Sequence, residues 1–204
     1  MMPLAGKPMM QNIIERVQRA EAIDKIVVTC PVGDVLPLAD SIPRGVLVDP
    51  WTGDESDLVS RYLCAALAVQ ADIIVRIPCD NPCVDPAYID AAVTSYMNGD
   101  YTFYTNTTEY VNGLFVDGVG CEVFSASRLK WLDVRTGDNP LWREHPHKWF
   151  YDMNTLDDIA ADIRLDVNTQ EDYEFIKDIY DHVTHNRFTI AEVLTYLESK
   201  KDTA

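Results

Sequence analysis

Three features are missing from this 204-residue sequence: long apolar runs, clusters of basic residues and a basic-then-apolar start. The first and third absences argue against a membrane span and a signal peptide. Lysine and arginine total 17 against 33 acidic residues, so the formal net charge is −16. Because nucleic-acid binding relies on neutralising phosphates, nucleic acid is not expected as a partner. We therefore expect a cytoplasmic protein that binds neither membranes nor nucleic acid.

Cysteine is sparse and odd in number, at positions 30, 64, 79, 83 and 121. This usage favours reduced thiols over a disulfide framework. Cys79 and Cys83 are four residues apart, but no second pair of Cys or His accompanies them, so a zinc site is not predicted. The Gly-x-Ser-x-Gly, Walker and dinucleotide motifs are also missing, which disfavours hydrolases, P-loop kinases and dehydrogenases.

Apolar strand-like runs alternate with amphipathic helical segments along most of the chain. Strands are predicted near residues 25–30, 46–49 and 73–77, and helices over 9–23, 56–71 and 86–98. Continuous apolar strands alternating with helices are typical of a mostly parallel α/β sheet covered on both faces, so we expect these three strands to be neighbours. Residues 1–204 are expected to form one domain, with an irregular insertion at about 101–149. A strand at 164–169 and a closing helix at 170–183 follow.

The clearest chemical candidate is Asp80, which directly follows the third predicted strand between Pro78 and Pro82. Ligands of α/β sheets gather at the carboxyl ends of strands. A carboxylate there is well placed to bind Mg²⁺, although a role in the turn is an equal alternative. For Asp85, directly before Pro86, a helix cap is favoured.

A second candidate pair is Asp166 and Asn168, which are two residues apart on a predicted strand and so share a face. Asp172 fits a helix cap better. Arg143 and His145, in the segment Arg-Glu-His, are candidates for contacting an anionic substrate. His145 and His147 alone are a weak metal signal.

Several segments, in this order, resemble cytidylyltransferases of the spore-coat polysaccharide, acylneuraminate and Kdo type. They are PLAGKPMMQNIIERVQRAEAIDKIVV, GDESDLVSRY, DIIVRIPCDNPCVDPAYID, GVGCEVFSASRL, REH and RLDVNTQEDYEFI. The resemblance implies a glycosyltransferase-A-like nucleotidyltransferase fold and a reaction of CTP with a sugar or sugar acid, with Mg²⁺ as cofactor. We also predict a homodimer, in which the insertion at 101–149, rich in aromatic residues, carries much of the contact, although ordinary core positions are an equal alternative for these residues.

The resemblance also assigns roles to single residues. Asp80 falls on the metal-binding and catalytic acid. Asn168 falls on the second metal-binding position, for which Asp166, on the same face, is the substitute ligand. The nucleotide- or substrate-binding positions are Lys7, Arg61, Asn81, Glu122, Arg143 and His145.

Two departures weaken the resemblance. The sequence starts just after the position of the family's Gly/Ser-rich phosphate-binding loop, and Asn168 stands where the family has an aspartate. We therefore expect little catalysis from the chain as given. The alternative to an enzyme is a non-catalytic sugar-binding or assembly relative of the same fold. A glycosyltransferase ranks last, because no Asp-x-Asp motif follows a strand.

Overall fold

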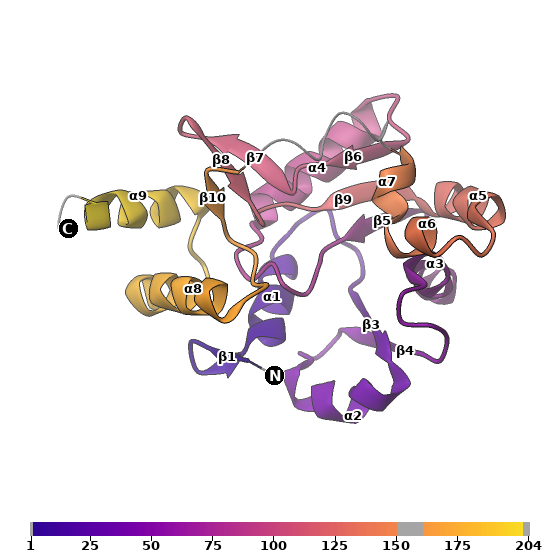
Figure 1. Ribbon diagram of the computed structural model, residues 1–204, viewed down its shortest axis with the longest axis horizontal. Coiled ribbons are helices and arrows are strands. Elements are labelled where there is room, and N and C mark those ends of the chain that lie inside the picture. Colours follow the sequence, from indigo (N-terminus) through magenta and orange to yellow (C-terminus); the bar gives the residue numbers. More distant parts are fainter. Residues whose placement is uncertain (1, 151–160, 202–204) are drawn as a thin grey trace.

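A computed structural model describes residues 2–150 and 161–201 (Figure 1). Its long helices are α1 (Met9–Val17), α3 (Leu58–Val69), α4 (Pro86–Asn98), α5 (Ala126–Thr136), α8 (Gln170–Val183) and α9 (Ile190–Lys201). Three short helices are α2 (Val35–Leu38), α6 (Pro140–Glu144) and α7 (Pro146–Phe150). Within the described ranges, no helix is both long and apolar enough to cross a bilayer.

The first two predicted strands pair as expected, but the third does not join them. Strand β3 (Val27–Pro31) runs parallel to β4 (Leu47–Trp51), in a register that sets Val27 against Leu47. Strand β5 (Ile73–Arg76) instead pairs antiparallel with β9 (Glu122–Ser125), whose other side takes β6 (Phe103–Thr105). The prediction of one parallel set is therefore wrong for β5. An apolar run shows that a strand is buried, but it does not identify its partner.

The insertion at 101–149 is more regular than predicted. Strands β7 (Thr108–Val111) and β8 (Leu114–Asp117) form a hairpin, and β10 (Ile163–Arg164) adds parallel to β8. The two residues of the turn, Asn112 and Gly113, both have positive φ, as short hairpin turns require. A two-stranded unit of β1 (Pro3–Leu4) and β2 (Lys7–Pro8) precedes α1.

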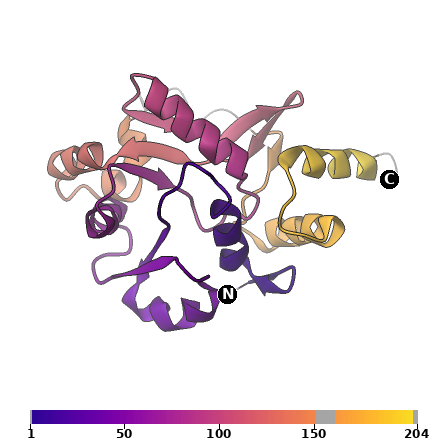
Figure 2. The same cartoon turned by 180° about the vertical axis from the view of Figure 1, so that it is seen from behind.

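Helices cover both faces of the β5–β9–β6 sheet, as predicted. On β9, Val123 packs with α1 and α4, whereas the next residue, Phe124, packs with α3 and α5. Seen from behind, α4 lies across this sheet (Figure 2). A separate core joins β8 to α8 and α9 through Val116, Ile176 and Val193, and it includes Leu165, directly after β10. The carboxyl end of β5 therefore lies between two cores, where the predicted acidic residues meet.

Candidate active site at the carboxyl end of β5

The chain leaves β5 through a loop that ends at a helix cap. Asp85 is the N-cap of α4, and its Oδ1 accepts a hydrogen bond of 3.0 Å from the Ala87 N–H. Pro86 occupies the first turn, where a missing N–H costs nothing. Asp85 Oδ2 also accepts from the Ile190 N–H at 3.3 Å, which ties the loop to α9. The cap predicted for Asp85 is confirmed, so this carboxylate has a structural task.

Asp80 lies in the same loop but is differently placed. Its backbone carbonyl accepts a 2.8 Å hydrogen bond from the Val167 N–H, between Asp166 and Asn168. Its Oδ1 is buried and has no hydrogen-bond partner among the described residues. Burial raises the pKa of Asp80, and the nearby carboxylates of Asp166 and Asp117 raise it further. The structure thus brings together the two segments that sequence reasoning singled out, and leaves one acid oxygen available.

Asp166 is more fully engaged than Asp80. Arg164 donates to both of its oxygens, at 3.0 Å from Nε and 2.6 Å from Nη2, and the Asn168 amide donates to Oδ2. Asp166 and Asn168 therefore share a face, as their spacing predicts. Arg164 was missed by sequence reasoning, although it also lies two residues from Asp166 on the same strand face. Its side chain is 61% exposed, so a ligand has access to it.

The hairpin end approaches this segment closely at one glycine. Gly118 has φ +82°, and a Cβ at that position would lie 2.9 Å from the backbone N of Asp166. Only glycine therefore permits the approach that sets Asp117 beside Asp80 and Asp166. Asp172 forms a capping box with Thr169 at the start of α8, which confirms its predicted structural role.

Glu122, opposite Arg76 on neighbouring strands, forms a second buried group. Arg76 Nη1 lies 2.7 Å from Glu122 Oε1, and Arg76 Nε donates to the Tyr62 hydroxyl at 3.1 Å. Glu122 Oε2 is buried without a hydrogen-bond partner in the described part of the chain. Burial raises the pKa of Glu122, although Arg76 acts in the opposite direction. Register alone would have identified Arg76, had the antiparallel pairing been predicted.

Two histidines lie beside this carboxylate. His147 Nδ1 is 3.6 Å from Glu122 Oε1, and the His145 and His147 rings are 5.6 Å apart. His145 is close enough to lower the pKa of Glu122 electrostatically, against the effect of burial. Glu122 and His145, which are separated by more than twenty residues in the sequence, therefore belong to one polar group next to the Asp80 loop.

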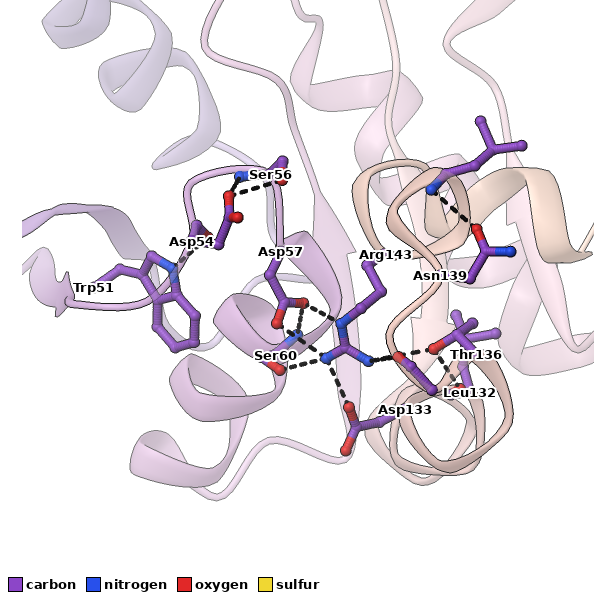
Figure 3. A network of polar contacts seen from close by, with 12 residues as sticks. Trp51, Asp54, Ser56, Asp57, Ser60, Leu132, Asp133, Thr136, Asn139 and Arg143 are labelled. Carbon is purple, nitrogen blue, oxygen red and sulfur yellow. Dashed lines mark hydrogen bonds and ion pairs between the residues drawn. The ribbon is translucent and has the colours of Figure 1, made fainter.

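Arg143, adjacent in sequence to that group, is bound by protein acceptors (Figure 3). Its guanidinium donates to both oxygens of Asp57, at 2.8 and 3.1 Å, and lies 2.8 Å from Asp133 Oδ1. Further acceptors are Ser60 Oγ and the Gly137 carbonyl. Arg143 thus joins α3, α5 and α6, and its predicted contact with substrate stays a prediction.

The same network corrects the predicted start of α3. The N-cap is Asp57 rather than Ser56, because the Asp57 carboxylate accepts from the Ser60 N–H at 3.0 Å as well as from Arg143. Ser56 instead donates to Asp54 Oδ1 from both its N–H and its hydroxyl. The Asp57 carboxylate therefore both caps α3 and binds Arg143. We call Arg143 with its acceptors the Arg143 clamp.

The remaining candidate residues lie in two different places, and only some of them are near Asp80. Lys7 pairs with Glu15 at 2.8 Å on β2 and α1. Arg61, on α3, acts electrostatically on the thiol of Cys79, the neighbour of Asp80, and its Nε has no partner in the described chain. Asn81 is buried in the Asp80 loop, where its backbone carbonyl accepts a hydrogen bond from the Val84 N–H. Arg61 and Asn81 therefore lie with Asp80, whereas Lys7 has its own partner.

A family model described as cytidylyltransferase matches residues 1–202. The chain belongs to the cytidylyltransferase family. Its members are nucleotidyltransferases. The spore coat polysaccharide biosynthesis protein SpsF of Bacillus subtilis strain 168 is 25% identical over 216 residues, covering 99% of this chain and 88% of that protein. A cytidylyltransferase structure from Leptospira borgpetersenii matches with a TM-score of 0.80 and 26% identity, over 98% of this chain and 87% of the other.

A more distant match supports the fold alone. It is the structure of CMP:2-keto-3-deoxy-manno-octonic acid synthetase complexed with CTP, at a TM-score of 0.61 and 13% identity. It covers 89% of this chain and 90% of the other. The nucleotidyltransferase fold predicted from the sequence is thereby confirmed.

Proposed function

We propose that the protein transfers CMP from CTP to a sugar or sugar acid used in surface glycan synthesis. The observation that carries the proposal is the buried, unpartnered Oδ1 of Asp80 beside Asp166, at the end of β5 in a chain of the cytidylyltransferase family. A carboxylate oxygen that is buried without a hydrogen-bond donor is stabilised when a cation binds to it. A divalent cation bound to triphosphate supplies what the protein does not.

The residues present fit Mg²⁺ as the cation. In the part of the chain that the structure describes, no three His, Cys, Asp or Glu residues form a complete metal cluster. Mg²⁺ is commonly held by one or two carboxylates, with water and phosphate oxygens filling the other positions. Asp80 and Asp166 are the carboxylates proposed here, with Asn168 orienting Asp166 through its amide. When bound, Mg²⁺ would neutralise charge on the phosphates.

The chain's other groups divide the remaining tasks. In the reaction, a sugar hydroxyl oxygen forms a bond to the α-phosphorus, the bond to the β-phosphate oxygen breaks, and pyrophosphate leaves with its electron pair. We assign Arg61 and Asn81 to the nucleotide. The Glu122 group, with His145, is assigned to the sugar, where the unpartnered Oε2 of Glu122 can accept its hydroxyl proton.

Two further parts of the proposal concern assembly and location. A homodimer through residues 101–149 is supported by the β7–β8 hairpin, where the Tyr110 and Phe115 rings are 5.1 Å apart and both residues are exposed. Trp142 and Trp149 instead pack on each other, with ring centroids 5.3 Å apart. A cytoplasmic location is supported by five free cysteines. Light scattering that reports a monomer at all concentrations would reject the dimer.

The test compares Asp80→Asn with the matched control Asp181→Asn, which alters an exposed carboxylate on α8. CTP binding is measured by calorimetry with and without Mg²⁺, and pyrophosphate release is measured with a panel of sugars and sugar acids. We expect Asp80→Asn alone to abolish the Mg²⁺-dependent part of CTP binding. Unchanged binding in Asp80→Asn would make Asp80 a turn residue. Binding of sugar without pyrophosphate release would favour the non-catalytic relative.

A further inference from the structure

A hollow lies at the end of the β5–β9 pair that is opposite to Asp80 and Glu122. Along β9, Glu122 lies opposite Arg76, whereas Ser125 lies opposite Ile73, at the other end of both strands. Three residue steps along a strand amount to about 10 Å. The hollow at the Ser125 end has a volume of about 400 Å³ and is lined by Tyr96, Tyr101, Thr102, Ser125, Ser127, Arg128 and Trp131. It is therefore separate from the Asp80 and Glu122 groups.

The hollow contains the guanidinium of Arg128, which forms no ion pair with an acid in the described part of the chain. The guanidinium of Arg128 lies over the Trp131 ring, 4.8 Å from its centroid, and that of Arg135 lies 5.2 Å from the same centroid. Arg128 Nε is buried and has no hydrogen-bond partner in the described part of the chain. The one acid of α5, Asp133, is held by Arg143 instead. In a chain of net charge −16, this is a local concentration of positive charge.

The rest of the lining suits a sugar ring. Tyr101 is 53% exposed, so it offers aromatic surface to the C–H face of a pyranose, whereas the Trp131 ring has Arg128 over it. The hydroxyls of Ser125 and Ser127 lie 3.0 Å apart at the start of α5, and Thr102 adds a third. The volume falls within the range of about 300–1,000 Å³ found for small-molecule sites.

We propose that this hollow binds an acidic saccharide, whose ring packs on Tyr101 and whose carboxylate pairs with Arg128 at the place where Arg128 lies over Trp131. A planar guanidinium matches a carboxylate with two parallel hydrogen bonds, and the hydroxyls of the lining match those of the sugar. A neutral sugar would leave Arg128 unpaired, and a bare anion would leave the aromatic surface uncovered. The site is a binding site additional to the one at Asp80 and needs neither CTP nor a metal ion.

The experiment titrates the wild-type protein with glucuronate, glucose and acetate, without CTP or Mg²⁺, and follows tryptophan fluorescence and calorimetric heat. We expect glucuronate to bind more tightly than glucose or acetate. Arg128→Gln should weaken glucuronate binding at least about tenfold, because it removes the two charged hydrogen bonds to the carboxylate. Lys130→Gln, which removes the same charge from α5 outside the lining, should leave binding unchanged.

Two controls distinguish binding in this hollow from binding at Asp80 and from a loss of folded protein. Asp80→Asn and Glu122→Gln, which alter the groups assigned to the metal and to the sugar, should bind glucuronate as the wild type does, so failure of the proposed function would not affect this result. Circular dichroism and the melting temperature show whether Arg128→Gln is folded, and the milder Ser127→Ala should weaken binding to a smaller extent. Equal binding of glucuronate by the wild type and Arg128→Gln would overturn the proposal. A change in oligomeric state caused by Arg128→Gln would also overturn it, because that result would assign the hollow to a second copy of the chain.

Discussion

The Asp80 group and the Arg143 clamp are both built from charges that distant segments bring together, yet their pairing differs. Around Arg143, two carboxylates, two hydroxyls and a carbonyl accept from one guanidinium. Around Asp80, carboxylates face one another, and one oxygen has no partner in the described chain. A paired network stabilises the fold. An unpaired one costs stability and is retained where a ligand completes it.

The largest expected effect is a loss of stability when the ion pairs of Arg143 are broken. Arg143→Ala removes the cation between Asp57 and Asp133, whose carboxylates then repel each other at the ends of α3 and α5. We expect a loss of about 3 kcal/mol in the free energy of unfolding, as for other poorly exposed ion pairs broken on one side. Urea denaturation measures it, with Arg44→Ala, an exposed arginine, as the control. Equal stability of the two variants would contradict the clamp.

A smaller effect is expected from acid. Burial tends to raise the pKa of Asp57, but the hydrogen bonds from Arg143 and Ser60 outweigh it and lower the pKa. A lowered pKa contributes stability above the unfolded value of about 3.9, and this stability is lost as the pH falls through the folded value. The stability difference between wild type and Asp57→Asn should therefore be full at pH 7 and shrink below about pH 4. A difference that does not change with pH would contradict this pairing.

In the unpaired group the expected change in stability is smaller and has the opposite sign. The raised pKa of Asp80 gives stability that is present at low pH and lost as the pH rises through the folded value. At neutral pH, Asp80→Asn should therefore raise the free energy of unfolding slightly. Asp178→Asn is the matched control. Its pKa is lowered by Lys200 and Tyr196, so this variant should lose stability. A loss in Asp80→Asn would contradict the comparison.

The smallest effect concerns the neighbouring thiol. The surrounding protein partly desolvates the Cys79 thiol and so raises its pKa, although the residue is exposed like Cys64, and the Asp80 carboxylate raises that pKa further. Asp80→Asn should lower that pKa and speed the reaction of Cys79 with a disulfide reagent at mildly alkaline pH, because the thiolate is the reacting form. Exposed Cys64 is the internal reference. Cys83 and Cys121 are buried, with pKa values raised to about 12, and should stay unreactive until the protein unfolds.

Sequence reasoning reached what depends on local pattern. It located α3, α4 and α8 within a few residues and the caps at Asp85 and Asp172, and it singled out both Asp80 and Asp166. It missed what depends on strand register and on distant contacts. The Arg76–Glu122 pair exists only because β5 and β9 are antiparallel, and the Asp57–Arg143 contact joins residues 86 positions apart. Periodicity carries no information on either contact, since it records which face is buried rather than which partner lies beside it.

The separation of β5 from β3 has a consequence for handling the protein. In the described sheets, β3 has β4 as its one partner and β5 has β9, so one edge of each strand has no strand partner. Such open edges invite pairing between molecules. Pro31 in β3 and Pro50 in β4 lack the N–H that pairing needs, and so blunt one of the two sheets. Strand β5, with the sequence Ile-Ile-Val-Arg, has no proline, and self-association in concentrated solution would begin there.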